Sequence, residues 1–213
     1  MAKKIMFNDK YSLTQAVLDG RKTMTRRIIK CPRTFKGEWV AGFNIHRRHS
    51  DKKIVGWPCM YDADEREFDM GEIFPKYKVG EVVAIAQSYL DLSLAEVSQW
   101  KSNGNKTTIN SLAGWTNKLF TKAELMPHHI RITNIKIEKL QGISDKDCLK
   151  EGIYKGQCGS ADTHFMDAYY YKGDIQPYCT PREAFAALID KVSGKGTWES
   201  NPYVFAYEFE LID

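Results

Sequence analysis

The end of the chain has the clearest alternation of apolar and polar positions. From Tyr203 to Leu211 every second residue is aromatic or aliphatic, which predicts a half-buried β-strand. Apolar runs at residues 4–7, 82–89 and 130–140 predict three more strands. In the last of these the apolar residues change parity near Asn134, which indicates a β-bulge.

Helical spacing of apolar residues occurs in three other segments. In residues 12–20, Ser12 is the predicted N-cap of a helix and Gly20 ends it. In residues 144–152, a capping-box pattern begins a second helix, and Gly152 ends it. Thr180 and Pro181 begin a third helix, which ends at Gly194. Its predicted buried stripe is Phe185, Leu188, Ile189 and Val192. The elements do not alternate in βαβα order, which disfavours a doubly wound sheet and favours the α+β class.

The chain is expected to form a single domain over residues 1–213, with three insertions. Residues 30–75 contain a predicted hairpin (39–45 with 54–61) and an acidic stretch, and residues 91–124 are polar and mixed. Residues 154–179 are rich in Gly, Tyr and polar side chains and are predicted to be a loop.

Composition excludes several classes of protein. The chain has 43% hydrophobic and 27% charged residues, ordinary values for a globular protein. Its five cysteines include no CxxC pair, and its histidines lack partners at metal spacing, so we expect neither a metal site nor a cofactor. With no apolar stretch of about 20 residues and no apolar leader behind the N-terminal lysines, a cytoplasmic protein without membrane contact is expected.

Charge points to a phosphate-bearing partner. The net charge is +4, and four cations fall within residues 21–27: Arg21, Lys22, Arg26 and Arg27. This stretch has neither helical nor strand periodicity and is expected to be a surface loop. Arg47 and Arg48, at the predicted hairpin turn, would extend the same basic surface.

Four blocks along the chain resemble the ASCH domain, a relative of the PUA domain. They are residues 16–27 (AVLDGRKTMTRR), 75–89, 126–152 and 198–203 (WESNPY), in the order of that family. The arrangement is most similar to the larger ASCH proteins of bacteriophages and prophages. At the end of the second block, where related sequences carry Arg-Glu, this chain has Ala86 and Gln87.

The resemblance implies a small mixed β-barrel with flanking helices and a cleft beside the Lys-Thr-x-Thr segment. The family is associated with RNA binding, and one bacterial branch hydrolyses N4-acetylcytidine to cytidine and acetate. The Lys, Thr and Glu of that branch match Lys22, Thr25 and Glu151. Trp198 and Asn201, in the fourth block, are candidates to line the cleft, with core packing and turn formation as the equal alternative.

These residue types suit amide hydrolysis. Thr25 would be the nucleophile, and Lys22 the base, its pKa lowered by neighbouring cations. Glu151, near a helix C-terminus, would carry a proton to the leaving amine. Three interpretations stay open: a hydrolase of N4-acylated cytidine derivatives, a non-enzymatic RNA- or nucleotide-binding module that interferes with a host process, and an assembly partner that uses the aromatic insertion.

Overall fold

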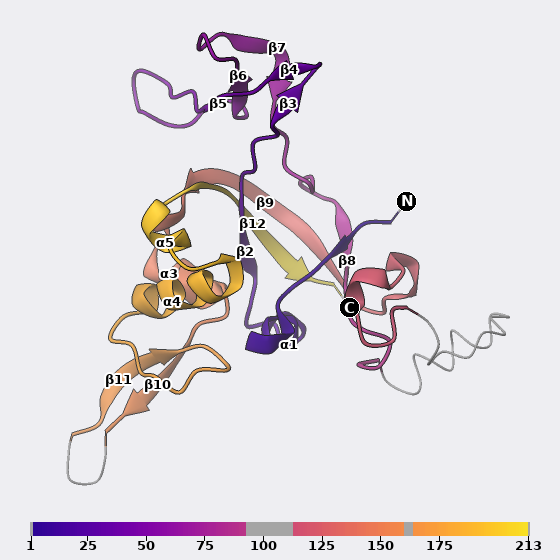
Figure 1. The fold of residues 1–213 in the computed structure, drawn as a ribbon. Coiled ribbons are helices and arrows are strands. Elements are labelled where there is room, and N and C mark those ends of the chain that lie inside the picture. The colour runs from indigo at the N-terminus through magenta and orange to yellow at the C-terminus, as the bar shows by residue number, and fades with distance from the viewer. Residues whose placement is uncertain (1, 93–112, 160–163, 213) are drawn as a thin grey trace, which may run out of the picture.

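A five-stranded sheet forms the centre of the computed structural model, which describes residues 2–92, 113–159 and 164–212 (Figure 1). The strand order is β1-β8-β9-β12-β2, with β1 parallel to β8 and the other pairs antiparallel. The predicted α+β class is confirmed. The sheet is open, because β1 and β2 lie at its two edges, and the described strands do not close into a barrel. The bounds are β1 (Lys4–Ile5), β2 (Met24–Ile28), β8 (Val82–Ile85), β9 (His129–Lys139) and β12 (Tyr203–Leu211).

The long strands β9 and β12 carry the predicted bulge. Glu208 pairs with Asn134, but the next residue, Phe209, pairs with Ile132, so one residue of β9 is skipped. The prediction of a half-buried β12 is wrong in one respect: Val204 and Ala206, on the face expected to be polar, are fully buried. β12 lies between β9 and β2, and side chains pack on both of its faces.

Helices α3, α4 and α5 lie together on one side of the sheet, and α1 lies near its β2 edge (Figure 1). The Ser144 hydroxyl accepts a hydrogen bond from the Asp147 amide at 3.1 Å, and Thr180 caps α4 in the same way. Ser12 precedes α1 but makes no side-chain capping bond. The bounds are α1 (Leu13–Leu18), α3 (Asp145–Lys150), α4 (Pro181–Ser193) and α5 (Thr197–Ser200), with short 3-10 turns at Asp9–Tyr11, Lys118–Phe120, Ala123–Leu125 and Leu140–Gly142.

The first insertion, residues 30–75, forms two small sheets beyond one end of the main sheet (Figure 1), and two of its rings pack edge-on against β12: Phe43 against Tyr203 and Trp57 against Phe205. The predicted hairpin is confirmed in part, since β5 pairs with β6. The bounds are β3 (Thr34–Phe35), β4 (Glu38–Trp39), β5 (Gly42–Asn44), β6 (Cys59–Tyr61) and β7 (Glu67–Glu72). Much of the second insertion, residues 93–112, lies outside the described residues.

The third insertion is not the predicted loop. Strands β10 (Tyr154–Cys158) and β11 (Met166–Tyr170) pair as an antiparallel hairpin that projects from the body (Figure 1). The rings of Tyr154 and Tyr170 stack across the two strands, with centroids 5.7 Å apart. Because both faces of a projecting hairpin carry polar residues, the apolar alternation that identifies a strand is weak here.

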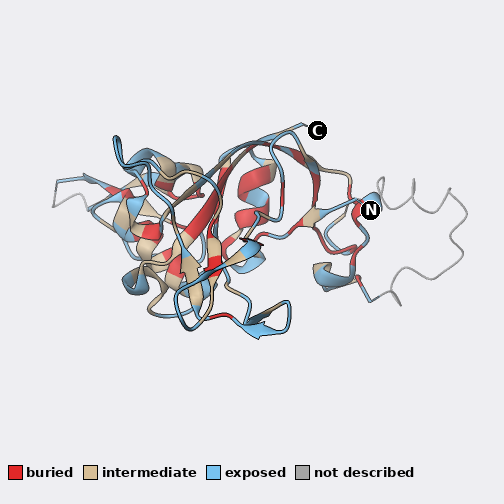
Figure 2. Cartoon of the chain, turned by 90° about the horizontal axis from the view of Figure 1, so that it is seen from above, coloured by how far each residue is buried: buried red, intermediate tan, exposed pale blue. Residues whose placement is uncertain are grey.

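Buried residues concentrate in the central strands and on the helix faces turned toward them (Figure 2). Ile85, Ile130 and Ile132 from the sheet meet Phe185 and Leu188 from α4 in one continuous core. This core fixes α4 against the sheet and thereby forms one wall of the site described next. No helix in the described part of the chain has the length and apolar character needed to cross a bilayer.

Candidate functional site

The basic segment at residues 21–27 is not the surface loop expected from the sequence. Its second half enters the edge strand β2, in which Thr25 pairs with Tyr207 of β12. Just before β2, the Lys22 amide donates to the carbonyl oxygen of Ala16 at the end of α1, at 2.8 Å. This turn sends the Lys22 side chain inward, where it is only 2% exposed. Arg26 is also buried, so the predicted cationic surface made by all four residues is wrong.

Lys22 forms a short buried ion pair with Glu151. Its ammonium donates to Glu151 Oε2 at 2.6 Å and to the Glu151 carbonyl oxygen at 2.8 Å. Glu151 is the C-cap of α3, and Gly152 follows it at φ +106°. An added Cβ at Gly152 would lie 3.1 Å from Leu13 Cδ2, so the glycine lets α3 approach α1 closely. The local backbone therefore sets the position of the Glu151 carboxylate.

Arg26 connects Glu151 to two further carboxylates. Its Nη1 donates to Glu151 Oε1 at 3.0 Å, and its Nε donates to Glu138 Oε1 at 2.8 Å. Nη2 lies 2.7 Å from the same Glu138 oxygen, at an angle that does not form a hydrogen bond, and 3.6 Å from Asp147. Because three carboxylates surround Arg26, its charge is neutralised inside the protein and is not free for a phosphate.

Burial lowers the pKa of Lys22, because the charged ammonium loses its hydration. The carboxylate of Glu151 opposes this shift, and the charges of Arg27 and Arg26 add to it. The direction agrees with the sequence argument, but the main cause differs, since that argument relied on the neighbouring cations alone. A lysine whose charged form is disfavoured is neutral more often than a surface lysine, and only the neutral amine can accept a proton.

Lys22, Thr25 and Glu151 line one cavity of about 440 Å³. The polar groups come from β2, from the turn before it and from the C-terminal end of α3, and another wall is apolar, from Phe185, Leu188 and other residues of α4. The size and the mixture of an apolar wall with a few polar groups are typical of small-molecule sites. The Thr25 hydroxyl makes no hydrogen bond within the described part of the chain. It is therefore available to a ligand.

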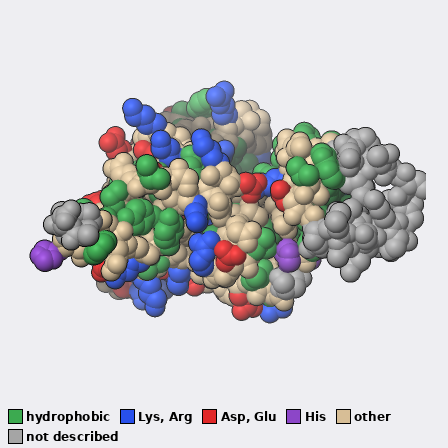
Figure 3. Space-filling view, turned by 90° about the horizontal axis from the view of Figure 1, so that it is seen from below, with side chains coloured by type: hydrophobic (Ala, Val, Ile, Leu, Met, Phe, Trp, Pro, Cys, Tyr) green, Lys and Arg blue, Asp and Glu red, His purple; other side chains and the backbone are tan. Residues whose placement is uncertain are grey.

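The other predicted cations occupy different surroundings. Arg21 is exposed and pairs with Asp19 at 2.9 Å. Arg27 lines the cavity, lies 5.9 Å from the centre of the Phe7 ring, and donates from Nη2 to the Met6 carbonyl oxygen at 2.6 Å. Figure 3 shows a face on which Lys and Arg side chains are interspersed with hydrophobic and acidic ones.

Arg47 and Arg48 are exposed on the turn between β5 and β6, and neither lines this cavity. Arg48 pairs with Asp51 at 3.3 Å, and Arg47 donates to the Lys52 carbonyl oxygen at 3.0 Å. They do not extend the site around Lys22, and the turn uses both side chains in its own contacts.

Trp198 and Asn201 also lie outside the cavity lining. Asn201 has a left-handed backbone, with φ at 45°, and its side-chain oxygen accepts a hydrogen bond from the Gln141 amide at 2.8 Å. The Trp198 ring packs edge-on against Phe185, with centroids 6.1 Å apart. These contacts favour the turn and packing interpretation of the fourth block.

Sequence reasoning missed Glu138 and Asp147, the two other carboxylates around Arg26, and it missed that α4 forms an apolar wall of the cavity. Glu138 falls on the polar side of the β9 alternation together with Lys136, so the sequence pattern carried no signal of its role. In the part of the chain that the structure describes, no group of three or more His, Cys, Asp or Glu side chains is arranged to hold a metal ion. Comparison of the chain with protein-family models, curated proteins and solved structures finds no match.

Proposed function

We propose that this chain is an ASCH-like amidohydrolase, with an opened form of the family's PUA-like barrel, and that it removes the acyl group from N4-acylated cytidine derivatives. The observation that carries the proposal is the convergence of Lys22, Thr25 and Glu151 on one cavity. Lys22 and Thr25 lie just before and within β2, whereas Glu151 lies at the end of α3, more than a hundred positions away in the sequence. Their chemistry is that of a nucleophile, a base and a proton carrier.

In the first half of the reaction, the Thr25 oxygen attacks the acyl carbon while neutral Lys22 takes the hydroxyl proton. Lys22 then passes a proton to Glu151 across their 2.6 Å contact. When the C–N bond breaks, Glu151 gives that proton to the departing N4 amine, and the acyl group remains on Thr25 as an ester.

Water completes the cycle. Lys22 takes a proton from the water molecule as its oxygen attacks the ester carbon, and the C–O bond to Thr25 breaks. The proton returns to the Thr25 oxygen, and the acyl group leaves as a carboxylic acid. The apolar wall from α4 limits the access of other water to the ester, which restricts hydrolysis to the molecule next to Lys22.

One observation favours a second candidate, binding without chemistry. Both carboxylate oxygens of Glu151 are already bonded, one to Lys22 and one to Arg26. Such a network also has a purely structural use, since it holds β2 against α3. In this alternative the cavity binds RNA, a nucleotide or a modified nucleoside, and the Thr25 hydroxyl only positions the ligand. An assembly partner that uses the residue 30–75 insertion is a third alternative with no separate support.

The deciding experiment is acetate release from N4-acetylcytidine. Replacing Thr25 by Val keeps the shape of the side chain, and we expect it to lower turnover at least about a hundredfold. Thr23→Val is the matched control, because Thr23 lies two positions away and outside the cavity lining. Thr25→Ser keeps a hydroxyl and should retain much of the activity. Hydrolysis that survives in Thr25→Val excludes Thr25 as the nucleophile, and no hydrolysis by the unmodified protein favours the binding alternative.

A further inference from the structure

A second cavity of about 450 Å³ lies directly beside the first. The two share four lining residues, which are Met6, Arg27, Ile28 and Lys30. The two cavities therefore lie side by side, with these four residues between them. The Arg27 side chain lies at the junction, held by its hydrogen bond to the Met6 carbonyl oxygen and its contact with the Phe7 ring.

Among the residues that the structure describes, the second cavity is lined by several cations and by no acidic side chain. Its basic residues are Lys4, Arg27, Lys30 and Lys76. The Lys4 ammonium is used internally, since it donates to the carbonyl oxygens of Lys118 and Leu119 at 3.0 and 2.8 Å. Arg27, Lys30 and Lys76 are exposed, and none of the three pairs with a carboxylate in the described part of the chain. This differs from the first cavity, where Glu151 neutralises Lys22.

The unbalanced positive charge affects the residues of this cavity. Burial lowers the pKa of Lys4, and the nearby charge of Lys76 lowers it further. Like charges gathered without a counter-ion favour binding of an anion, because each cation then gains a partner. A phosphate group is the anion that several Lys and Arg side chains commonly bind together.

An aromatic side chain completes the second cavity. Phe74 is 64% exposed, and its ring leans edge-on against Trp57 at a centroid distance of 6.3 Å. An exposed ring beside cations is the arrangement on which nucleobases stack.

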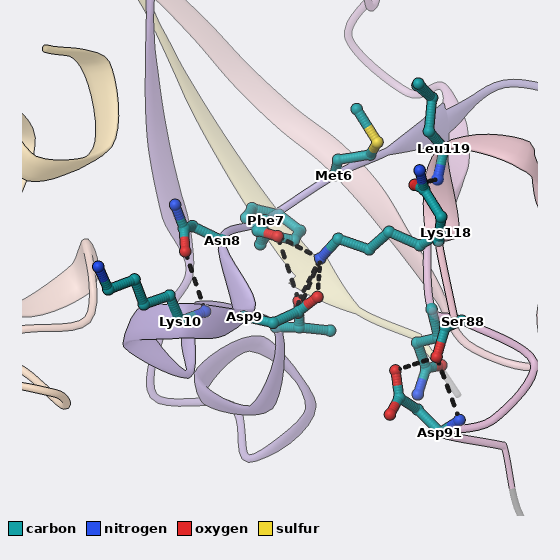
Figure 4. A network of polar contacts seen from close by, with 12 residues as sticks. Met6, Phe7, Asn8, Asp9, Lys10, Ser88, Asp91, Lys118 and Leu119 are labelled. Atoms are coloured by element: carbon teal, nitrogen blue, oxygen red, sulfur yellow. Dashed lines mark hydrogen bonds and ion pairs between the residues drawn. The ribbon is translucent and has the colours of Figure 1, made fainter. Parts of the chain in front are cut away.

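The rim of the second cavity near Met6 and Leu119 is held in place. Lys118 donates to Asp9 Oδ1 at 2.7 Å and to the Phe7 carbonyl oxygen, as the dashed lines in Figure 4 show. These bonds fix Leu119, the next residue, beside Met6 (Figure 4). These contacts give this part of the rim a defined position.

We propose that the second cavity binds a phosphate group attached to the substrate nucleoside, so that the substrate is a phosphate-bearing nucleotide rather than a free nucleoside. The acylated base occupies the first cavity beside Thr25, the phosphate lies at Arg27, Lys30 and Lys76, and a neighbouring base, where there is one, reaches Phe74. The placement of the base rests on the function proposed above. The placement of the phosphate rests on the second cavity alone.

The test compares three substrates: N4-acetylcytidine, its 5′-monophosphate, and a dinucleotide that contains it. We expect kcat/KM for the phosphate-bearing substrates to exceed that for the nucleoside by at least about tenfold, mainly through KM. Replacing both Lys30 and Lys76 by Met should remove most of this preference. Lys146→Met is the matched control, because Lys146 is exposed on α3 and lines neither cavity, and it should leave the preference unchanged.

Phe74→Ala separates the two sources of phosphate. If Phe74→Ala lowers the preference for the dinucleotide over the nucleoside but not the preference for the monophosphate, the bound group is a phosphodiester within a strand. If both preferences are unchanged in Phe74→Ala, the bound group is a phosphomonoester. Equal use of all three substrates, or a preference that survives the double substitution, overturns the proposal while leaving the hydrolase function intact.

Failure of the proposed function would be recognised separately. If none of the three substrates is hydrolysed, calorimetry with cytidine 5′-monophosphate and cytidine tests the second cavity by binding. Tighter binding of the monophosphate that is lost in the Lys30 and Lys76 double variant supports the phosphate site without the chemistry. Equal binding of the two ligands overturns it.

Discussion

The buried contact between Lys22 and Glu151 contributes a coupling free energy to the stability of the fold, and a double-mutant cycle can measure it. The two side chains are 2% and 6% exposed, and their charged atoms are 2.6 Å apart. Removing one partner of such a buried pair costs about 3–5 kcal/mol, mainly because the other charge stays buried without its counter-ion. Lys22→Met falls at the lower end of this range, since Glu151 keeps Arg26 as a partner. Glu151→Gln falls at the upper end, since two cations lose their carboxylate.

The double variant should be less destabilised than the sum of the two single variants. With Met at position 22 there is no ammonium that would lose its carboxylate when Glu151 becomes Gln. We therefore expect a coupling free energy of about 1.5–3 kcal/mol. The assay is urea denaturation followed by circular dichroism, which gives the free energy of unfolding of each variant.

The pair of Lys136 and Glu208 serves as the matched control for this cycle. Its atoms are 3.0 Å apart, but the side chains are 43% and 27% exposed, so its coupling should be only about 0.2–1 kcal/mol. A Lys22–Glu151 coupling no larger than that of the control refutes the reasoning.

Three other outcomes follow from the same contacts. Because the folded-state pKa of Lys22 is lowered from 10.5, the unfolded chain binds more protons between that lowered pKa and pH 10.5, so the free energy of unfolding should rise with pH across this window. Lys22→Met should lack this part of the rise, and an identical pH profile contradicts the assignment. Thr180→Ala removes the cap of α4 and should cost about 1 kcal/mol by urea denaturation, with Thr197→Ala, half-buried in the four-residue helix α5, costing less. Phe185→Ala should cost about 3–5 kcal/mol and weaken ligand binding in the first cavity, and a loss below 1 kcal/mol would show that α4 does not depend on it.

Local patterns in the sequence predicted the elements whose formation depends on nearby residues. The cap at Thr180, the helix after Ser144 and the bulge opposite Glu208 all agree with the structure. These features follow from short-range hydrogen bonds and from the side-chain period of the element itself. The alternation of β12 was also visible, but its burial on both faces depends on neighbours that are distant in the sequence.

The candidate site was only half visible in the sequence. Lys22, Thr25 and Glu151 could be named by resemblance, and their convergence on one cavity is a property of the tertiary structure. The sequence also suggested that Lys22 and Arg26 were surface cations. A run of charged residues reveals its sign and spacing, but it does not reveal carboxylates that lie more than a hundred positions away. Charge burial depends on long-range pairing, and so only the tertiary structure decided which cations are paired inside and which remain free for a ligand.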